Sequence, residues 1–167
     1  MKARPAAPQP SFLCDEMLGR LARYLRAAGF DTRLACDGAP DARILRLATA
    51  EDRLLLTLDR QILEHKAARA RVIVLPAGNL EQHAGALGGR LGLDWLAFSF
   101  TRCLLDNVPL APASSAQRAA VPPLSQSYGG EVKSCPECGR VYWPGSHFRR
   151  MHATLCCWQE RRGAPIR

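Results

Sequence analysis

The sequence predicts an α/β fold in which helices cover a parallel sheet, with a small metal-binding module at the C-terminal end. Three observations carry this prediction. Strand-sized apolar segments alternate with amphipathic helices through residue 100, the composition changes after that point, and a C-x-x-C pair stands near residue 135. A chain of 167 residues, 47% of them hydrophobic, can bury one sizeable core.

Strands and helices alternate through the first hundred residues. Residues 11–14 (SFLC) predict a short buried strand, and Leu18, Leu21 and Leu25 then recur at helical spacing until Gly29 can end the helix. The same pattern predicts three more strands, at 32–36, 53–58 and 72–76, and three more helices, at 41–53, 60–69 and 79–92. Such alternation with short connections is typical of right-handed crossovers and of a parallel sheet covered on both faces.

The chain divides into three predicted segments. Residues 1–10 contain three prolines and no aromatic residue and predict a flexible tail, residues 11–100 form the α/β domain, and residues 101–162 form the metal-binding module. Inside the module, a stretch from about 111 to 130 is rich in Pro, Ser, Ala and Gly and predicts a flexible loop. A last helix follows, with large apolar residues on one side: Phe148, Met151, Leu155 and Trp158.

The positive charge is concentrated toward the C-terminal end. Of the net charge of +8, residues 1–100 hold 14 Lys and Arg against 11 Asp and Glu, and residues 101–167 hold 9 against 4. A basic segment suits nucleic acid, although an ordinary solvated surface has the same composition. No apolar stretch approaches the roughly 20 residues that span a bilayer, and none follows the basic N-terminus as in a signal peptide. We therefore expect a cytoplasmic protein without a membrane span.

The seven cysteines favour reduced thiols and metal ligands over a disulfide framework, because their number is odd and no secretory signal is present. Cys135 and Cys138 in CPECG form a C-x-x-C turn that can direct two thiolates at one ion. A thioredoxin-type redox pair would instead be expected beside a βαβ unit. A structural zinc needs two more ligands, and Cys103 is the best third candidate. Cys14 and Cys36 lie in predicted strands and are expected to be small core residues.

Carboxylates follow two of the predicted strands. Asp15 comes directly after the first strand and Asp59 directly after the third, so both belong to the edge where open α/β sheets bind ligands, and Asp41 begins the second helix near the same edge. Each can also serve as an ordinary helix N-cap. Asp37 and Glu16 are further acids, expected to be surface residues. Converging carboxylates predict a hard cation, Mg²⁺ or Mn²⁺, held by Asp15 and Asp59. Such an ion can activate water for attack on a phosphodiester.

Candidate substrate-binding residues lie near these acids. Arg20, Arg23 and Arg26 recur every three residues on the first helix and could contact phosphates, although a solvated face opposite the leucines explains them equally well, Arg26 above all. Thr57 would point to the same face as Asp59 and could hydrogen-bond a carboxylate or a phosphate, or be an ordinary buried strand residue.

The C-terminal module combines basic and aromatic residues, which together can hold phosphates and stack on bases. The basic residues are Arg149 and Arg150, with Arg140 before them. The aromatic residues Trp143 and Phe148 either take part in this binding or bury the module against the sheet. Tyr142 belongs to the same set.

Four segments, in this order, resemble a known family: FLCDEMLGRLARYLRAAGFDT, LLLTLDR, RC and CPECGRVYWPGSHFRRM. They are similar to the PIN-like RNase domain found at the C-terminus of the nematode exonuclease Mut-seven and as a stand-alone bacterial protein, over residues 11 to 151 or so. The resemblance implies a PIN-like fold with a zinc ribbon and a ribonuclease activity that depends on acids. Asp15 and Asp59 match the acids of the first and third strand signatures, and Asp41 matches one at the start of the second helix. PIN nucleases usually have a fourth acid.

The resemblance also implies a fourth zinc ligand, because the family generally has a second cysteine three positions after Cys103. Here that position is Asp106, an acceptable but less selective zinc ligand. Solvent could fill the place instead, and so could four nearby side chains: His147, His152, Cys156 and Cys157.

Two functions are therefore open. The first is a metal-dependent ribonuclease, and the second is a non-catalytic RNA-binding module with the same fold. A receiver-like phosphoacceptor domain also uses acids after parallel strands, but it would be expected to carry a lysine after a late strand, and VIVLPAGN has none.

Overall fold

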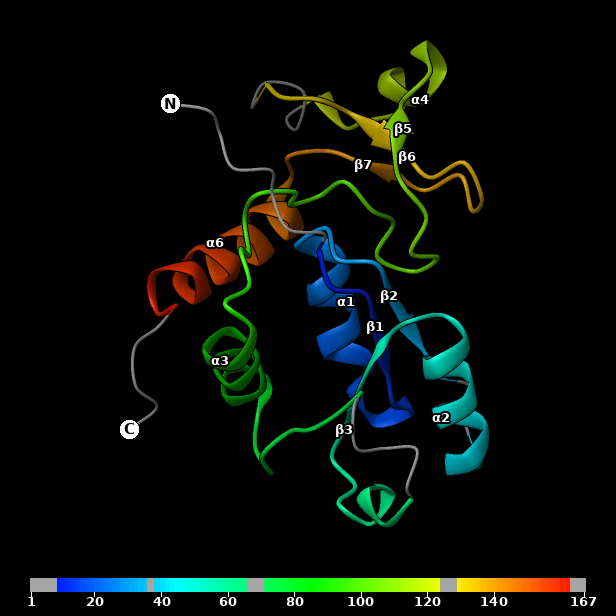
Figure 1. Cartoon of the computed structure of the whole chain (residues 1–167). Helices are drawn as coiled ribbons and strands as arrows, with labels where there is room; N and C mark the ends of the chain where they lie inside the picture. The colour runs from blue at the N-terminus through cyan, green and yellow to red at the C-terminus, as the bar shows by residue number, and fades with distance from the viewer. Residues whose placement is uncertain (1–8, 36–37, 66–70, 124–128, 163–167) are drawn as a thin grey trace, which may run out of the picture.

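The computed structural model describes residues 9–35, 38–65, 71–123 and 129–162 (Figure 1). Its elements are β1 (Phe12–Cys14), η1 (Glu16–Leu18), α1 (Gly19–Ala27), β2 (Thr32–Leu34), α2 (Asp41–Ala50), β3 (Leu54–Thr57), η2 (Gln61–Glu64), β4 (Val72–Val74), α3 (Leu80–Leu91), β5 (Ala111–Pro112), α4 (Ser115–Ala119), β6 (Lys133–Ser134), β7 (Val141–Tyr142) and α6 (Ser146–Glu160).

The central feature is a four-stranded sheet in the order β2-β1-β3-β4, with all neighbouring strands parallel. The chain leaves β1 to form β2 on one side and returns to form β3 on the other. The connections therefore reverse between β1 and β3, which is the topological switch point of the sheet. The predicted class, a parallel sheet flanked by helices, is confirmed.

Apolar side chains cover both faces of this sheet. One face packs against α2 through Leu13, Leu55 and Ile44. The other face and α1 carry the larger core, which also takes in α3 and α6. Trp95 is fully buried at its centre, with its ring against those of Phe30 and Trp158. The last helix therefore belongs to the core of the α/β domain, because the apolar side predicted for it packs there.

The small C-terminal sheet has the order β5-β6-β7 and is antiparallel. Figure 1 shows it at one end of the molecule, and the short helical turn η2 that follows β3 at the opposite end. None of the helices that the structure describes is long and apolar enough to cross a bilayer.

Two predicted elements differ from the structure. The expected helix at 60–69 is only the short η2 in its described part, which ends before residue 66. The expected loop at 111–130 contains β5 and α4, and α4 begins with a capping box between Ser114 and Gln117. The S-x-x-Q spacing of that box was a readable signal. The tail at 1–8, Cys36 and Asp37 lie outside the described residues.

Arg26 is the main correction on the first helix, because it was expected to face solvent and is buried. Its guanidinium donates to the carbonyl oxygens of Thr32 (2.8 Å), Leu104 (2.9 Å) and Leu105 (2.6 Å). The loop that contains Leu104 packs over α1 and removes Arg26 from water. Burial lowers the pKa of Arg26, but a guanidinium stays protonated in proteins.

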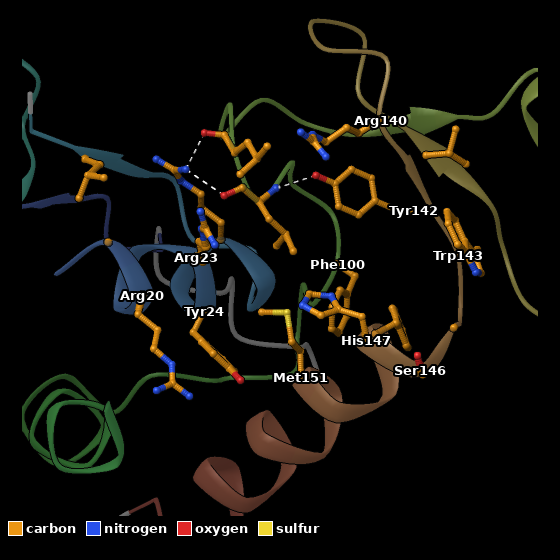
Figure 2. Close-up of a pocket in the computed structure, with 18 residues that line it drawn as sticks. Arg20, Arg23, Tyr24, Phe100, Arg140, Tyr142, Trp143, Ser146, His147 and Met151 are labelled. Atoms are coloured by element: carbon orange, nitrogen blue, oxygen red, sulfur yellow. Dashed lines mark hydrogen bonds between the residues drawn. The ribbon is translucent and has the colours of Figure 1, made fainter. Parts of the chain in front are cut away.

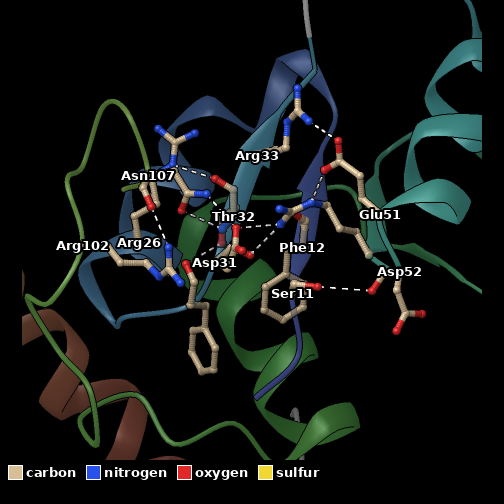
Figure 3. A network of polar contacts seen from close by, with 12 residues as sticks. Ser11, Phe12, Arg26, Asp31, Thr32, Arg33, Glu51, Asp52, Arg102 and Asn107 are labelled. Carbon is tan, nitrogen blue, oxygen red and sulfur yellow. Dashed lines mark hydrogen bonds and ion pairs between the residues drawn. The ribbon is translucent and has the colours of Figure 1, made fainter. Parts of the chain in front are cut away.

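A second polar network joins the same loop to the beginning of the sheet (Figure 3). Asp31 accepts a hydrogen bond from Asn107 (2.7 Å) and forms an ion pair with Arg53 (2.7 Å). Arg102 donates to the carbonyl oxygen of Gly29 (3.2 Å). The C-terminal segment is thus held to the α/β domain by hydrogen bonds as well as by apolar packing.

Candidate functional site

The acids predicted as catalytic lie at the carboxyl edge of the sheet. Asp15 directly follows β1 and is half-buried, and its backbone N–H extends the ladder by donating to the carbonyl oxygen of Leu56 in β3 (2.9 Å). One carboxylate oxygen accepts from the N–H of Glu16 (2.8 Å) and the other from the hydroxyl of Thr57 (2.9 Å). Asp15 therefore caps η1 with one oxygen, as the capping interpretation expects, and presents the second toward β3.

Thr57 joins the ends of β1 and β3. It is fully buried, and its hydroxyl donates to Asp15 while it accepts from the backbone N–H of Asp59 (3.0 Å). Asp59 is exposed and accepts from the N–H of Gln61 (2.8 Å) through one oxygen. The expectation that Thr57 hydrogen-bonds a carboxylate is met. Phosphate binding by Thr57 stays a prediction, and in this structure the side chain is fully buried and its hydroxyl is already engaged by Asp15 and the Asp59 backbone.

Asp41 lies beside the same edge with a different local role from the one expected. It is the first residue of α2 rather than its cap, because Pro40 occupies the cap position and α2 has no side-chain cap. Its carboxylate is 3.9 Å from Nε2 of His65, and 41% of the side chain is exposed. The exposed Glu16 accepts from the N–H of Gly38 (2.6 Å), which holds the connection after β2 against η1.

Among the described residues, Asp15, Asp41 and Asp59 do not form a group that could hold one metal ion together. The arrangement is more open than the predicted convergence to a common point. Mg²⁺ commonly takes only one or two carboxylates and keeps several waters, so the pair Asp15 and Asp59 is the part of the prediction that suits this ion best.

A closer group lies in the C-terminal module. The ligand atoms of Cys103, Asp106, Cys135 and Cys138 all lie within 4.8 Å of one another, an arrangement that could hold a metal ion. An Asp106 oxygen is 3.3 Å from the sulfurs of Cys103 and Cys135, and the Cys103 and Cys138 sulfurs are 3.9 Å apart. A tetrahedral zinc with Zn–S of about 2.3 Å and Zn–O of about 2.0 Å requires S···O and S···S separations of about 3.5 and 3.8 Å. The donor set therefore fits zinc.

Hydrogen bonds within this group shift the acidity of its members. Thiol donors, Cys138 first, lower the pKa of Asp106, and the same bond raises the pKa of Cys138 to about 12. Burial raises the pKa of Cys103, but hydrogen bonds from the Asp106 backbone and the Tyr142 hydroxyl outweigh it and lower that pKa. The Tyr142 oxygen is 3.1 Å from the Cys103 sulfur and accepts from the N–H of Leu104 (3.1 Å). Tyr142 thus fixes one ligand from outside the group.

The alternative fourth ligands lie elsewhere in the described part of the chain. The His152 ring is stacked on Phe148, and its Nδ1 is 3.5 Å from the Cys156 sulfur. Cys157 is exposed on α6. None of the four alternatives belongs to the described metal-ligand group: His147, His152, Cys156 and Cys157.

The predicted substrate-binding arginines separate into two sets. Arg20 and Arg23 line a groove of about 1240 Å³ that runs along α1, between this helix and the unit formed by β7 and the start of α6. We call it the α1 groove. Figure 2 shows Arg20, Arg23 and Tyr24 on one side of it and Arg140, Tyr142 and Trp143 on the other. The second set, Arg149 and Arg150, is exposed on α6 and does not line the α1 groove.

The comparison with protein families agrees with this architecture. The family model described as the Mut7-C RNAse domain matches residues 10–155. The chain belongs to the Mut7-C RNAse domain family. It matches no curated protein and no solved structure. The matched Mut7-C region covers the parallel sheet, the acids at its carboxyl edge and all four members of the cysteine group.

Sequence reasoning missed three side chains of this Mut7-C domain. Tyr142 was considered for stacking, whereas its hydroxyl contacts Cys103, and Arg26 was assigned to solvent. His65 was not considered, and it lies near Asp41. The first two contacts join residues 39 and 78 positions apart, so no local pattern could signal them. His65 follows the third strand by a few residues, and nothing else in the local sequence indicated that it lies near Asp41.

Proposed function

We propose that this chain is a metal-dependent ribonuclease that hydrolyses RNA phosphodiester bonds at the carboxyl edge of its parallel sheet. Asp15 and Asp59 would hold a Mg²⁺ or Mn²⁺ ion, and Asp41 would complete the acidic site from the start of α2. Membership of an RNase domain family supports this assignment of activity class.

The observation that carries the proposal is the position of Asp15 and Asp59 at the switch point between β1 and β3. Open α/β sheets bind ligands in this crevice, because the connections leave it in opposite directions and do not cover it. Thr57 holds the two strand ends in register through Asp15 and the Asp59 backbone. Asp59 is exposed and Asp15 only half-buried, so solvent reaches the pair.

The carboxylates have capacity left for an ion. Each carboxylate oxygen can accept more than one interaction, and only one oxygen of Asp59 is used by a hydrogen bond to another described residue. A bound divalent cation supplies an activated water and stabilises the charge that develops on the phosphate. The protein's own part is to hold Asp15 rigidly through Thr57 and Glu16, and to leave Asp59 open to the substrate.

We propose a structural zinc in the C-terminal module, held by Cys103, Cys135, Cys138 and Asp106. The separations of the donor atoms support this choice. Zinc bound there would join the turn around residue 136 to the loop that packs over α1, two segments with little apolar core of their own. If zinc is kept by Asp106→Ala and lost from Cys156→Ser, the assignment of Asp106 is wrong.

The activity can be tested with labelled RNA and added Mn²⁺. Asp59→Asn and Asp15→Asn should each reduce cleavage by at least about 100-fold, because a neutral amide binds a hard cation far less strongly. Asp94→Asn is a matched control, since Asp94 lies in the segment after α3, away from the carboxyl edge. Affinity for RNA, measured separately, should remain near the wild-type value.

The same experiment distinguishes the second candidate, a non-catalytic RNA-binding module. That role predicts no Mn²⁺-dependent cleavage by the wild-type chain above the level of the two variants. The observation that favours this alternative is that Asp15, Asp41 and Asp59 do not form a metal-ligand group among the described residues.

A further inference from the structure

The α1 groove has the composition of a surface for a polyanion with flat rings. Its lining contains Arg20, Arg23 and Arg140 and no aspartate or glutamate. Aromatic side chains line the same groove, among them Tyr24 and Trp143. The groove is partly open and larger than the roughly 300–1,000 Å³ of small-molecule pockets, which favours a polymer that passes through it.

The arginines of the groove are available for binding. Arg20 and Arg23 are exposed, and their side chains make no hydrogen bond or ion pair with any residue that the structure describes. Arg140 is also exposed, and its charge helps to lower the pKa of the Asp106 carboxylate. Arg20 and Arg23 have no carboxylate partner among the described residues, so their like charges repel each other and a chain of phosphates would relieve that repulsion.

Trp143 is the aromatic side chain best placed to meet a base. Tyr24 already packs against Trp158, and Phe148 against Phe100. Trp143 has no aromatic neighbour among the described residues and is partly exposed. Gly145 keeps space beside the indole, because an added Cβ there would lie 2.8 Å from its ring nitrogen. Gly145 thus packs against the nitrogen edge of the indole, and the partly exposed ring is part of the groove lining.

The groove also lies on the path to the acidic edge. Its lining includes Gly19 and Arg20, which follow Asp15 after the single turn η1. It also includes Arg140 and Tyr142, next to the cysteine group. Because α1 spans nine residues, about 13 Å separate its ends, a length that a short stretch of polynucleotide covers.

We propose that the α1 groove binds a single-stranded polynucleotide, with Trp143 stacked on a base and Arg20, Arg23 and Arg140 on phosphates. A duplex does not fit this chemistry, because its bases are already stacked and expose no face to the indole. That the groove guides the strand toward Asp15 rests on the proposed ribonuclease function. The binding itself does not, so the two can fail separately.

Binding is measured in an Asp59→Asn background without chelator, so that the RNA stays intact and the cysteine group is undisturbed. Fluorescence anisotropy of a labelled single-stranded oligoribonucleotide gives Kd, and the same strand in a duplex gives the comparison. We expect the duplex to bind at least about 10-fold more weakly. A duplex bound as tightly as the single strand would overturn the proposal.

The phosphate contacts are tested by changing Arg20, Arg23 and Arg140 together to Gln. Each phosphate contact to a single strand contributes about 0.7 to the slope of log Kd against log salt, so the slope should fall by about 2. A matched control removes the same charge from exposed arginines on α2 and α3: Arg43, Arg46 and Arg90. If the control weakens binding as much as the groove variant, the attraction is general and the groove has no special role.

The stacking contact is tested with Trp143→Leu and Trp143→Phe. Stacking on one base contributes about 1–3 kcal/mol, so Trp143→Leu should weaken single-strand binding about 5- to 160-fold, and Trp143→Phe should retain most of the affinity. Single-stranded RNA should quench tryptophan fluorescence in the parent and not in Trp143→Leu, because Trp95 and Trp158 are buried. Unchanged affinity and quenching in a folded Trp143→Leu variant would refute the stacking role.

Cleavage measurements separate this inference from the proposed function. If the wild type does not cleave RNA and the groove variants bind it weakly, the binding site is supported and the proposed ribonuclease activity is refuted. If cleavage depends on Asp59 and the groove variants bind RNA normally, the binding site is refuted and the proposed ribonuclease activity is supported.

Discussion

Replacing the buried Arg26 by methionine should destabilise the protein severely. The guanidinium donates three hydrogen bonds to the carbonyl oxygens of Thr32, Leu104 and Leu105. Methionine keeps the apolar stem but leaves these acceptors without their donor. Hydrogen bonds to charged groups contribute about 1.5–3 kcal/mol each, so the bonds to Thr32 and Leu104 together contribute about 3–6 kcal/mol. We expect the free energy of unfolding to fall by about 4 kcal/mol, because Leu105 is exposed and water can replace its bond.

Urea denaturation followed by circular dichroism measures this loss, and thermal unfolding should show a fall in Tm of about 10 °C. Arg23→Met is the matched control, since Arg23 lies on the same helix, is exposed and forms no described hydrogen bond through its side chain. The control should change the free energy of unfolding by less than about 0.5 kcal/mol. Equal effects of the two variants would refute the reasoning, because they would show that water replaces all three bonds of Arg26.

The same variant should weaken zinc binding. Leu104 and Leu105 lie between the ligands Cys103 and Asp106, so Arg26 holds the backbone that positions both. Competition with a chromophoric chelator should show faster zinc loss from Arg26→Met than from Arg23→Met. Identical zinc retention would mean that the loop keeps its shape without the arginine.

Three further predictions concern zinc, pH and backbone shape. Asp106→Cys should raise both zinc affinity, by chelator competition, and Tm, because thiolate is the stronger donor, and a lower Tm would count against Asp106 as a ligand. Hydrogen bonds from Arg53 and Asn107 outweigh burial and lower the pKa of Asp31. The charged Asp31 carboxylate therefore stabilises the fold at pH values above 3.8, its pKa in the unfolded chain. This stabilisation is lost as the pH falls through the lower pKa of the folded state. Asp31→Asn should therefore be less stable than wild type at pH 7 but not near pH 2 in urea titrations. Gly29→Ala should cost about 2 kcal/mol or more, since Gly29 has φ +94° and an added Cβ would lie 2.2 Å from a backbone oxygen, whereas Gly89→Ala in α3 should not destabilise the protein.

Much of the candidate site could be predicted because it depends on local order along the chain. A residue that directly follows a parallel strand must lie at the carboxyl edge, so Asp15 and Asp59 were placed correctly once the strands were recognised. Cys135 and Cys138 are three positions apart and share one turn, so their proximity needs no knowledge of the rest of the fold. Thr57 could be assigned a face but not a partner, since its bond to Asp15 crosses 42 positions.

The sequence alone determined the alternation of strands and helices, the parallel sheet, the acids at its edge and the cysteine turn, because periodicity and spacing over a few residues control each of these. The tertiary structure decided which loop covers α1. That packing buries Arg26, brings Asp106 and Cys103 to Cys135, and forms the α1 groove from segments more than a hundred residues apart. No short-range pattern predicts such contacts, because they arise from the fit between whole elements.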